Sequence, residues 1–132
     1  MSYLSNLFNL EGKVVAITGA GGHLCSEMAR GFARAGCSLA ILDLRLEKAL
    51  AVEAELRKEG FLNIISLGID VTRKEQHIEA LNSIVTLFEK VDILINGAGI
   101  NSPTPFINIS LQEWQAVLDS QLTGTFLGCQ VF

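Results

Sequence analysis

The sequence predicts an α/β domain in which a parallel sheet is covered by helices on both faces, and three observations lead to this prediction. Residues 13–35 contain a short β-branched apolar run, a glycine-rich turn, and a segment with small and apolar residues at helical spacing. Strand and helix patterns then alternate with short connections, which favours parallel strands and right-handed crossovers. The composition, with 49% hydrophobic and 18% charged residues, is expected for strands buried on both faces and also for a fragment whose missing part would cover some of its apolar surface.

The first half of the chain has three apolar runs separated by two segments with a helical pattern. Gly36 and Gly60 follow these two segments, at positions where glycine commonly ends a helix. The expected elements are a strand at 14–18, a helix at 22–35, a strand at 38–42, a helix at 46–59 and a strand at 63–69.

The second half adds one strand and two helices, and each helix is preceded by a Thr/Ser-x-x-Glu sequence that predicts a capping box. The strand ends in a glycine-rich turn, and a loop containing Pro103 and Pro105 leads to the last helix. The expected elements are a capping box at 72–75 with a helix to residue 89, a strand at 91–95, a turn at 96–99, and a capping box at 110–113 with a helix at 111–132.

Strands connected in this way form a Rossmann-type, doubly wound sheet with the strand order 3-2-1-4. Ligands of such sheets bind at the carboxyl ends of the strands, where the order reverses. We expect residues 1–132 to form a single, partial dinucleotide-binding domain, truncated after the fourth strand and its helix. Two features lead to this expectation: the apolar end of the chain has no helix-stop signal, and the fourth strand would be an uncovered edge.

Charge and hydropathy exclude several classes of protein. The net charge is −4 without a Lys/Arg cluster, which argues against nucleic-acid binding. No apolar run approaches the roughly 18–20 residues of a membrane span, and the N-terminal sequence lacks the features of a secretion signal, so we expect a cytoplasmic protein. Cys25, Cys37 and Cys129 have no metal-ligand spacing and are expected to be reduced thiols, with no metal site.

The glycine turn and the acid that follows it predict a site for a dinucleotide. Glycines at 19–22 allow close approach of the backbone to a pyrophosphate, and the N-terminus of the next helix offers free N–H groups. Asp43, about 20 residues further on, can accept hydrogen bonds from the ribose hydroxyls and would repel a 2′-phosphate. This favours NAD over NADP, although Arg45 could reduce the selectivity; the alternative is a solvated loop acid or a helix cap.

Four other features each have two interpretations. Asp70 either contacts the adenine amino group or serves as a turn acid, and the turn at 96–99 either lines the cofactor groove or is an ordinary connection. His23 could donate to a phosphate or have a surface or packing role. Trp114 and Phe126, on the last helix, are expected in the core or at an interface.

Five motifs, in the right order and at the right spacing, resemble the short-chain dehydrogenase/reductase family. They cover the chain from Lys13 onward: TGAGGHLC (18–25), ILDL (41–44), DVT (70–72), INGAGIN (95–101) and EWQAVLDSQLTGTF (113–126). The resemblance implies reversible hydride transfer between a nicotinamide and an alcohol or ketone, and a homodimer or homotetramer formed through the helix at 111–132. It also implies cofactor contacts from Thr18, Gly19, Gly21, Gly22, His23, Leu24, Asp43, Leu44, Asp70, Val71, Asn96, Gly97, Ala98 and Gly99.

The chain departs from the family's pattern in three respects. The second and third glycine slots of TGxxxGxG hold His23 and Cys25, so the pyrophosphate would sit slightly differently or bind more weakly, and the helix would be crowded against its strand. Gln121 replaces the asparagine that supports a proton relay in the family. The catalytic Ser and the Tyr-x-x-x-Lys pair are absent from the sequence, whose only tyrosine is Tyr3.

These points predict the cofactor-binding half of an NAD-dependent oxidoreductase. The GGHL sequence at 21–24 resembles a branch of the family directed to sugar acids, which suggests a small polyol, sugar acid or related ketone as the substrate. Without a tyrosine acid, the 132 residues alone should not turn over substrate. Any binding of NAD should be weak, because half of the cofactor groove is absent. Two alternatives are a non-catalytic dinucleotide-binding or regulatory module, and an interaction protein that docks through its last helix.

Overall fold

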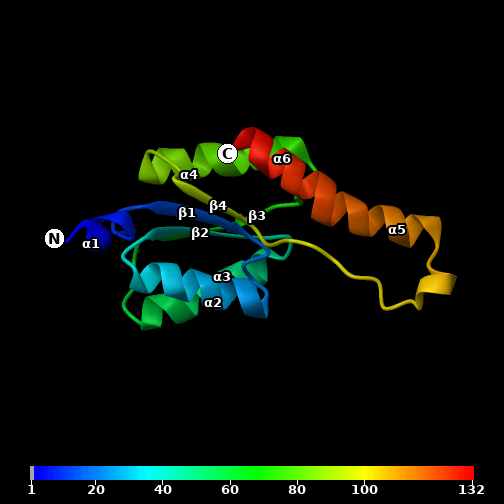
Figure 1. Ribbon diagram of the computed structural model, residues 1–132, viewed down its shortest axis with the longest axis horizontal. Helices are drawn as coiled ribbons and strands as arrows, with labels where there is room; N and C mark the ends of the chain where they lie inside the picture. Colours follow the sequence, from blue (N-terminus) through cyan, green and yellow to red (C-terminus); the bar gives the residue numbers. More distant parts are fainter. Residues whose placement is uncertain (1) are drawn as a thin grey trace.

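A computed structural model describes residues 2–132 as a four-stranded parallel sheet with helices on both faces (Figure 1). In chain order the elements are α1 (Tyr3–Leu7), β1 (Val14–Thr18), α2 (His23–Arg34), β2 (Ser38–Asp43), α3 (Leu46–Lys58), β3 (Ile64–Gly68), α4 (Lys74–Phe88), β4 (Ile93–Asn96), the 3₁₀ turn η1 (Phe106–Asn108), α5 (Leu111–Leu118), the π-helical turn η2 (Asp119–Thr123) and α6 (Gly124–Val131).

The sheet has the order β3-β2-β1-β4, which confirms the predicted fold class and strand order. The register aligns the carboxyl ends of the strands at one edge. Thr18 of β1 lies opposite Leu42 of β2 and Asn96 of β4, and Asp43 lies opposite Gly68 of β3. The loops that carry the predicted site residues therefore leave the sheet side by side.

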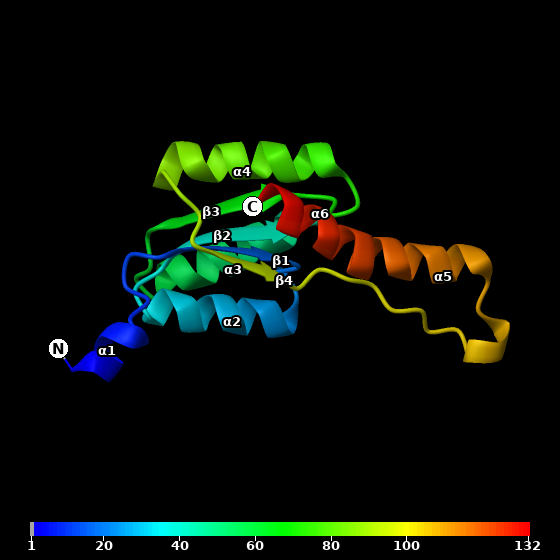
Figure 2. The same cartoon turned by 45° about the horizontal axis from the view of Figure 1, so that its top comes forward.

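Alternate residues of the two central strands face two separate cores. One face of the sheet packs against α2 and α3, and the other against α4 and α6 (Figures 1 and 2). Both strands are buried on both sides, as their continuous apolar sequence predicts. The first core contains Val15, Ile17, Leu39 and Ile41, and the second contains Val14, Ala16, Ala40 and Leu42.

The loop after β4 and the helix α5 extend beyond the end of the sheet (Figure 2). Helix α6 then returns over the sheet beside α4. The long helix predicted at 111–132 is therefore present, but the π-helical turn at Asp119–Thr123 interrupts its regular hydrogen bonding.

One of the two predicted capping boxes is wrong. Helix α4 begins at Lys74 after Arg73, and no side chain caps it. Thr72 lies one residue before the N-cap position, and its hydroxyl donates to Asp70 Oδ1 at 2.7 Å. The second box is confirmed, since the side chains of Ser110 and Glu113 bond each other's backbone N–H groups. The helices α1 and η1 were not expected from the sequence, and β4 begins later than predicted.

The hydroxyl of Thr18 joins the ends of β1 and β4. Its side chain is buried, and its Oγ1 accepts hydrogen bonds from the N–H groups of Gly97 at 3.1 Å and Ala98 at 3.2 Å. The same hydroxyl donates to the carbonyl of Ile95 at 3.4 Å. The turn after β4 is therefore fixed to the central strand by one side chain.

The loop between β4 and α5 is organised by Glu113. Its Oε1 accepts from the hydroxyls of Ser102 at 3.0 Å and Thr104 at 2.5 Å, and its Oε2 accepts from the N–H and the hydroxyl of Ser110, both at 3.0 Å. These donors, with the Thr104 hydroxyl first, lower the pKa of Glu113 from 4.5 to about 2.

We predict that Thr18→Val destabilises the fold by about 2 kcal/mol, because two part-buried hydrogen bonds lose their acceptor while the shape of the side chain is kept. Thr18→Ser keeps the hydroxyl and should cost about 1 kcal/mol, as expected for one buried methyl group. Urea unfolding measures both changes. Equal stability of the two variants would contradict a stabilising role for the hydrogen bonds between the Thr18 hydroxyl and the turn after β4.

We predict that the stabilising effect of Glu113 depends on pH. Because folding lowers the pKa of Glu113 to about 2, its contribution is complete above pH 4.5 and is lost as the pH falls toward 2. The difference in unfolding free energy between the wild type and Glu113→Gln should therefore be constant from pH 7 to 5 and shrink between pH 4.5 and 3. Urea unfolding at each pH tests this, and a difference that does not change with pH would refute it.

Candidate functional site

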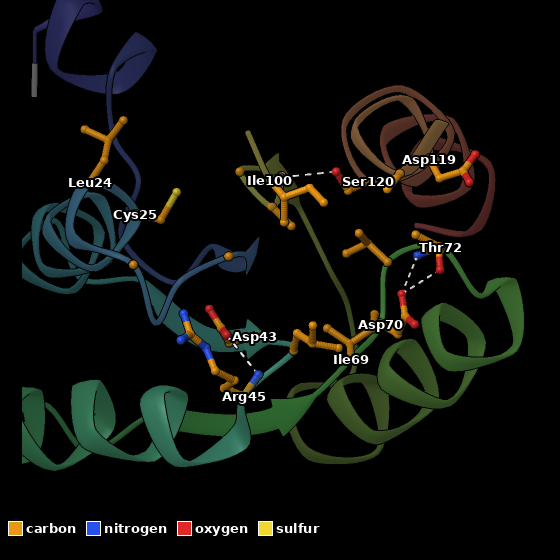
Figure 3. A pocket seen from close by; sticks show the side chains of 18 of the residues that line it. Leu24, Cys25, Asp43, Arg45, Ile69, Asp70, Thr72, Ile100, Asp119 and Ser120 are labelled. Atoms are coloured by element: carbon orange, nitrogen blue, oxygen red, sulfur yellow. Dashed lines mark hydrogen bonds between the residues drawn. The ribbon is translucent and has the colours of Figure 1, made fainter. Parts of the chain in front are cut away.

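A cavity of about 940 Å³ lies at the carboxyl edge of the sheet, where the turns after all four strands meet the helix at η2 (Figure 3). This volume is in the range of pockets that hold cofactors. Most of the predicted site residues line it: Gly19, Gly22, His23, Leu24, Asp43, Leu44, Asp70, Val71, Gly97, Ala98 and Gly99.

Four predicted site residues do not line the cavity but support its walls. Thr18 forms the clamp between β1 and β4. Gly21 lies behind Asp43 and donates its N–H to that carboxylate. The Asn96 Nδ2 donates to Cys129 Sγ at 3.5 Å, and the Gln121 amide bonds the loop after β4.

The N-terminus of α2 opens on the cavity without a cap. Gly22 is the N-cap residue, so no side chain bonds the first N–H groups, and the first turn contains no acidic residue. Gly19 has a φ of +70°, and a Cβ at this position would lie 2.8 Å from Ala98 Cα. Bare main chain and free N–H groups at a helix N-terminus form a site suited to an anion.

Asp43 is held in one orientation at the end of β2. Asp43 is 8% exposed, and its Oδ2 accepts from the Gly21 N–H at 2.9 Å. Its Oδ1 accepts from the Arg45 N–H at 3.0 Å, as Figure 3 shows. A Cβ on Gly21 would lie 2.8 Å from Oδ2 and 2.6 Å from Lys48 Cβ, so the turn cannot hold a larger residue there. A carboxylate has about four acceptor sites, so Asp43 can still accept hydroxyl donors from a ligand.

The segment after β3 presents an acceptor beside a donor. Asp70 Oδ1 accepts from the Thr72 N–H at 2.9 Å and from the Thr72 hydroxyl, as Figure 3 shows. Within residues 2–132, Asp70 Oδ2 and the Val71 N–H have no hydrogen-bond partner. These two groups match the edge of a nucleobase that carries an amino group next to a ring nitrogen.

Sequence reasoning missed two residues that hold this segment. Gln76 Oε1 accepts from the Asp70 N–H at 2.6 Å, and His77 Nε2 lies 2.8 Å from the Val71 carbonyl oxygen. His77 could have been noticed from its spacing, because it shares the apolar stripe of α4 with Ala80 and Ile84. No signal in the sequence distinguishes Gln76 from a surface residue.

Cys25 fits its glycine slot because the opposite residue has no side chain. The thiol is 7% exposed and belongs to the core beneath α2. A Cβ on Gly97 would lie only 2.3 Å from Cys25 Sγ, so Gly97 provides the space that the thiol occupies. Burial raises the pKa of the Cys25 thiol, and the negative charge of Asp43 raises it further.

The π-helical turn is bonded to the loop after β4 at two consecutive residues, Ile100 and Asn101. Ser120 Oγ accepts from the Ile100 N–H at 3.2 Å, as Figure 3 shows, and Gln121 Nε2 donates to the Ile100 carbonyl at 2.7 Å. Gln121 Nε2 also donates to Asn101 Oδ1 at 3.1 Å. The longer side chain of glutamine is therefore used to fasten this loop.

Two further properties concern residues 2–132 as a whole. None of the helices that these residues form is long and apolar enough to cross a bilayer. Nor do these residues place three or more His, Cys, Asp or Glu side chains around a common point where a metal could bind.

Comparisons with known proteins agree with this geometry. A family model described as short chain dehydrogenase matches residues 13–132. The chain is 34% identical to D-threitol dehydrogenase of Mycolicibacterium smegmatis, over 93% of this chain and 47% of that protein. It is also 34% identical to 5-keto-D-gluconate 5-reductase of Escherichia coli, over 96% of this chain and 50% of that protein. The chain thus spans about half the length of these curated relatives.

A solved structure with a bound dinucleotide has the same fold. It comes from Haemophilus influenza, is assigned as a D-mannonate oxidoreductase and contains NAD. It superposes with a TM-score of 0.87 at 33% identity, over 98% of this chain and 52% of that one.

We predict that the two buried cysteines resist alkylation in the folded protein. The thiolate is the reactive form, and burial is the main cause of the raised pKa of both Cys25 and Cys37. Iodoacetamide at pH 7.5 should label the exposed Cys129 first and the other two only after denaturation in urea. Peptide mass spectrometry measures the order of labelling. Labelling of Cys25 as fast as Cys129 would show that its thiol opens to the cavity.

Proposed function

The chain belongs to the short-chain dehydrogenase family, and from this premise we propose that it binds NAD as part of an NAD-dependent oxidoreductase. The proposed reaction of the whole protein is reversible hydride transfer between the nicotinamide and an alcohol or ketone. The observation that carries the proposal is the fixed carboxylate of Asp43, which lies at the cavity edge and is held by the glycine turn that would bind the pyrophosphate.

The proposed pyrophosphate site is the turn from Gly19 to Leu24. The uncapped N–H groups of α2 would donate to the phosphate oxygens, and the helix dipole favours their negative charge. His23 is exposed at the start of α2, so its imidazole can donate to the same group. The side chains of Leu24 and Leu44, 68% and 69% exposed, flank the opening of the cavity.

The proposed adenosine site lies across the ends of β2 and β3. Asp43 would accept from the ribose hydroxyls, and Asp70 with Val71 would meet the amino group and the ring nitrogen of adenine. The turn at 96–99 would flank the ribose on the nicotinamide side. Bound NAD supplies a nicotinamide ring that accepts or gives a hydride.

The names of the relatives support a small polyhydroxylated substrate. D-threitol is a polyol, and 5-keto-D-gluconate and D-mannonate are sugar acids. We propose a substrate of this class for the whole protein.

The 132 residues include no Tyr-x-x-x-Lys pair, so we propose that they bind the dinucleotide without transferring a proton to a carbonyl oxygen. The fastening of the loop by Gln121 supports a positioning role for this residue.

We also propose that the protein forms a homodimer or homotetramer through residues 111–132. Four large apolar side chains of this helix are exposed, at 86% for Leu111, 51% for Trp114, 66% for Leu122 and 59% for Phe126. Exposed apolar side chains gathered on one helix are typical of an interface.

A cytoplasmic location is proposed because all three cysteines are free thiols.

We predict that Asp43→Ala weakens NAD⁺ binding about tenfold, because hydrogen bonds from the ribose to a charged acceptor are lost. Binding of NADP⁺ should be unchanged or tighter, since the repulsion of its 2′-phosphate is removed. Isothermal titration of the wild type and the variant with both dinucleotides tests this. The control is Asp43→Asn, which removes the charge but keeps the shape and should also improve NADP⁺ binding. Equal weakening of both dinucleotides would refute the assignment.

A further inference from the structure

We propose that His77 and Gln76 are positioning residues that select adenine over other purines, by fixing the peptide groups of Asp70 and Val71 at the cavity wall. This inference rests on the proposed binding of NAD. Neither residue lines the cavity, and both act through the backbone of the segment after β3.

Among residues 2–132 the side chain of His77 makes one hydrogen bond, and its partner determines which ring nitrogen carries a proton. The side chain is completely buried on α4, and Nε2 lies 2.8 Å from the carbonyl oxygen of Val71. A carbonyl oxygen only accepts, so Nε2 must carry the proton and Nδ1 is left as an acceptor. Nδ1 is buried and has no partner among residues 2–132. A leucine would avoid this unpaired atom, so the bond to Val71 is the feature that accounts for a histidine here.

Gln76 fixes the peptide group on the other side of Asp70. Its Oε1 accepts from the Asp70 N–H at 2.6 Å, at the point where β3 has ended and no neighbouring strand can accept this bond. Two consecutive side chains of α4 therefore bind the two ends of one short segment. Gln76 takes the N–H of Asp70, and His77 takes the carbonyl of Val71.

The same segment is also held from the side of α6. A Cβ on Gly124 would lie 2.8 Å from Val71 Cγ2, so helix and side chain are in close contact. The ring of Phe132 meets His77 edge-on, with the ring centroids 6.2 Å apart and an interplanar angle of 81°. Val71 is thus confined between α4 and α6 and presents its N–H group in one direction.

The hydrogen-bonding groups of Asp70 and Val71 that remain without a partner determine which base the segment would bind. Asp70 Oδ1 is occupied by Thr72, whereas Oδ2 is an available acceptor and the Val71 N–H an available donor within the described residues. Adenine offers an amino donor beside the acceptor N1, which complements both groups. Hypoxanthine offers a carbonyl acceptor beside an N1–H donor, so each of its groups would face a like partner.

The test compares NAD⁺ with nicotinamide hypoxanthine dinucleotide, which differs only in the base. We expect the wild-type chain to prefer NAD⁺ by at least about tenfold in Kd, because the hypoxanthine base cannot form the two hydrogen bonds that adenine would form. His77→Leu removes the donor, and the preference should fall to about threefold or less. His77→Gln can place an amide N–H near the Val71 carbonyl and should restore most of the preference. Isothermal titration of each protein gives the two Kd values and their ratio.

A second pair of variants tests the inference without changing a buried residue. Gln76 is only partly buried, so Gln76→Leu should fold and reduce the preference, whereas Gln76→Glu keeps an acceptor for the Asp70 N–H and should retain it. A role in stability alone would lower the melting temperature and leave the ratio of Kd values unchanged.

The outcomes separate this inference from the proposed function. If the wild type binds neither dinucleotide, the proposed function fails. If the wild type binds NAD⁺ but does not distinguish the two bases, or if His77→Leu and Gln76→Leu keep the full preference, this inference is wrong and NAD binding stands.

Discussion

The close approach of the turns after β1 and β4 is the constraint on which the cavity depends. Thr18 bonds two N–H groups of the second turn, and Gly19 brings its backbone so near Ala98 that no Cβ can lie between them. The thiol of Cys25 fills the space that Gly97 leaves open. Because these contacts join the central strand β1 to the edge strand β4 at their carboxyl ends, they set the distance between the N-terminus of α2 and the turn after β4.

The fold could be predicted because its signals are local and repeated. Continuous apolar runs identify strands buried on both faces, and Gly36 and Gly60 end the two helices at positive φ. The parallel order then follows from the alternation of strand and helix. The candidate cavity could also be predicted, since parallel strands bring their carboxyl ends to one edge, where Asp43 and Asp70 meet the glycine turn.

The residues that hold the cavity walls in place could not be predicted, because their hydrogen bonds depend on how the helices and loops pack in three dimensions. The Thr72–Glu75 pattern predicts a capping box, but α4 begins with Arg73 as its N-cap, and the Thr72 hydroxyl instead joins a local turn with Asp70. Gln76 has no distinguishing signal, because whether its amide faces solvent or a backbone N–H depends on how α4 packs. The π-helical turn likewise arises where Ser120 and Gln121 bond Ile100 across a long loop.

The altered glycine turn need not weaken a dinucleotide site, because glycines at other positions keep the backbone around the site free of side chains. The side chain of Cys25 has room because Gly97 opposite it has none, and His23 is exposed at the edge of the cavity. What the pyrophosphate requires is free N–H groups and no side chain between them and the cavity, and Gly22 as N-cap meets this requirement. In the proposed NAD site, recognition of the adenosine half would depend on Asp43, Asp70 and Val71, all fixed by hydrogen bonds to the backbone within this chain. Such a site would select its dinucleotide independently of the groups that act on the substrate, because no residue of the adenosine wall would be needed at the reacting carbon.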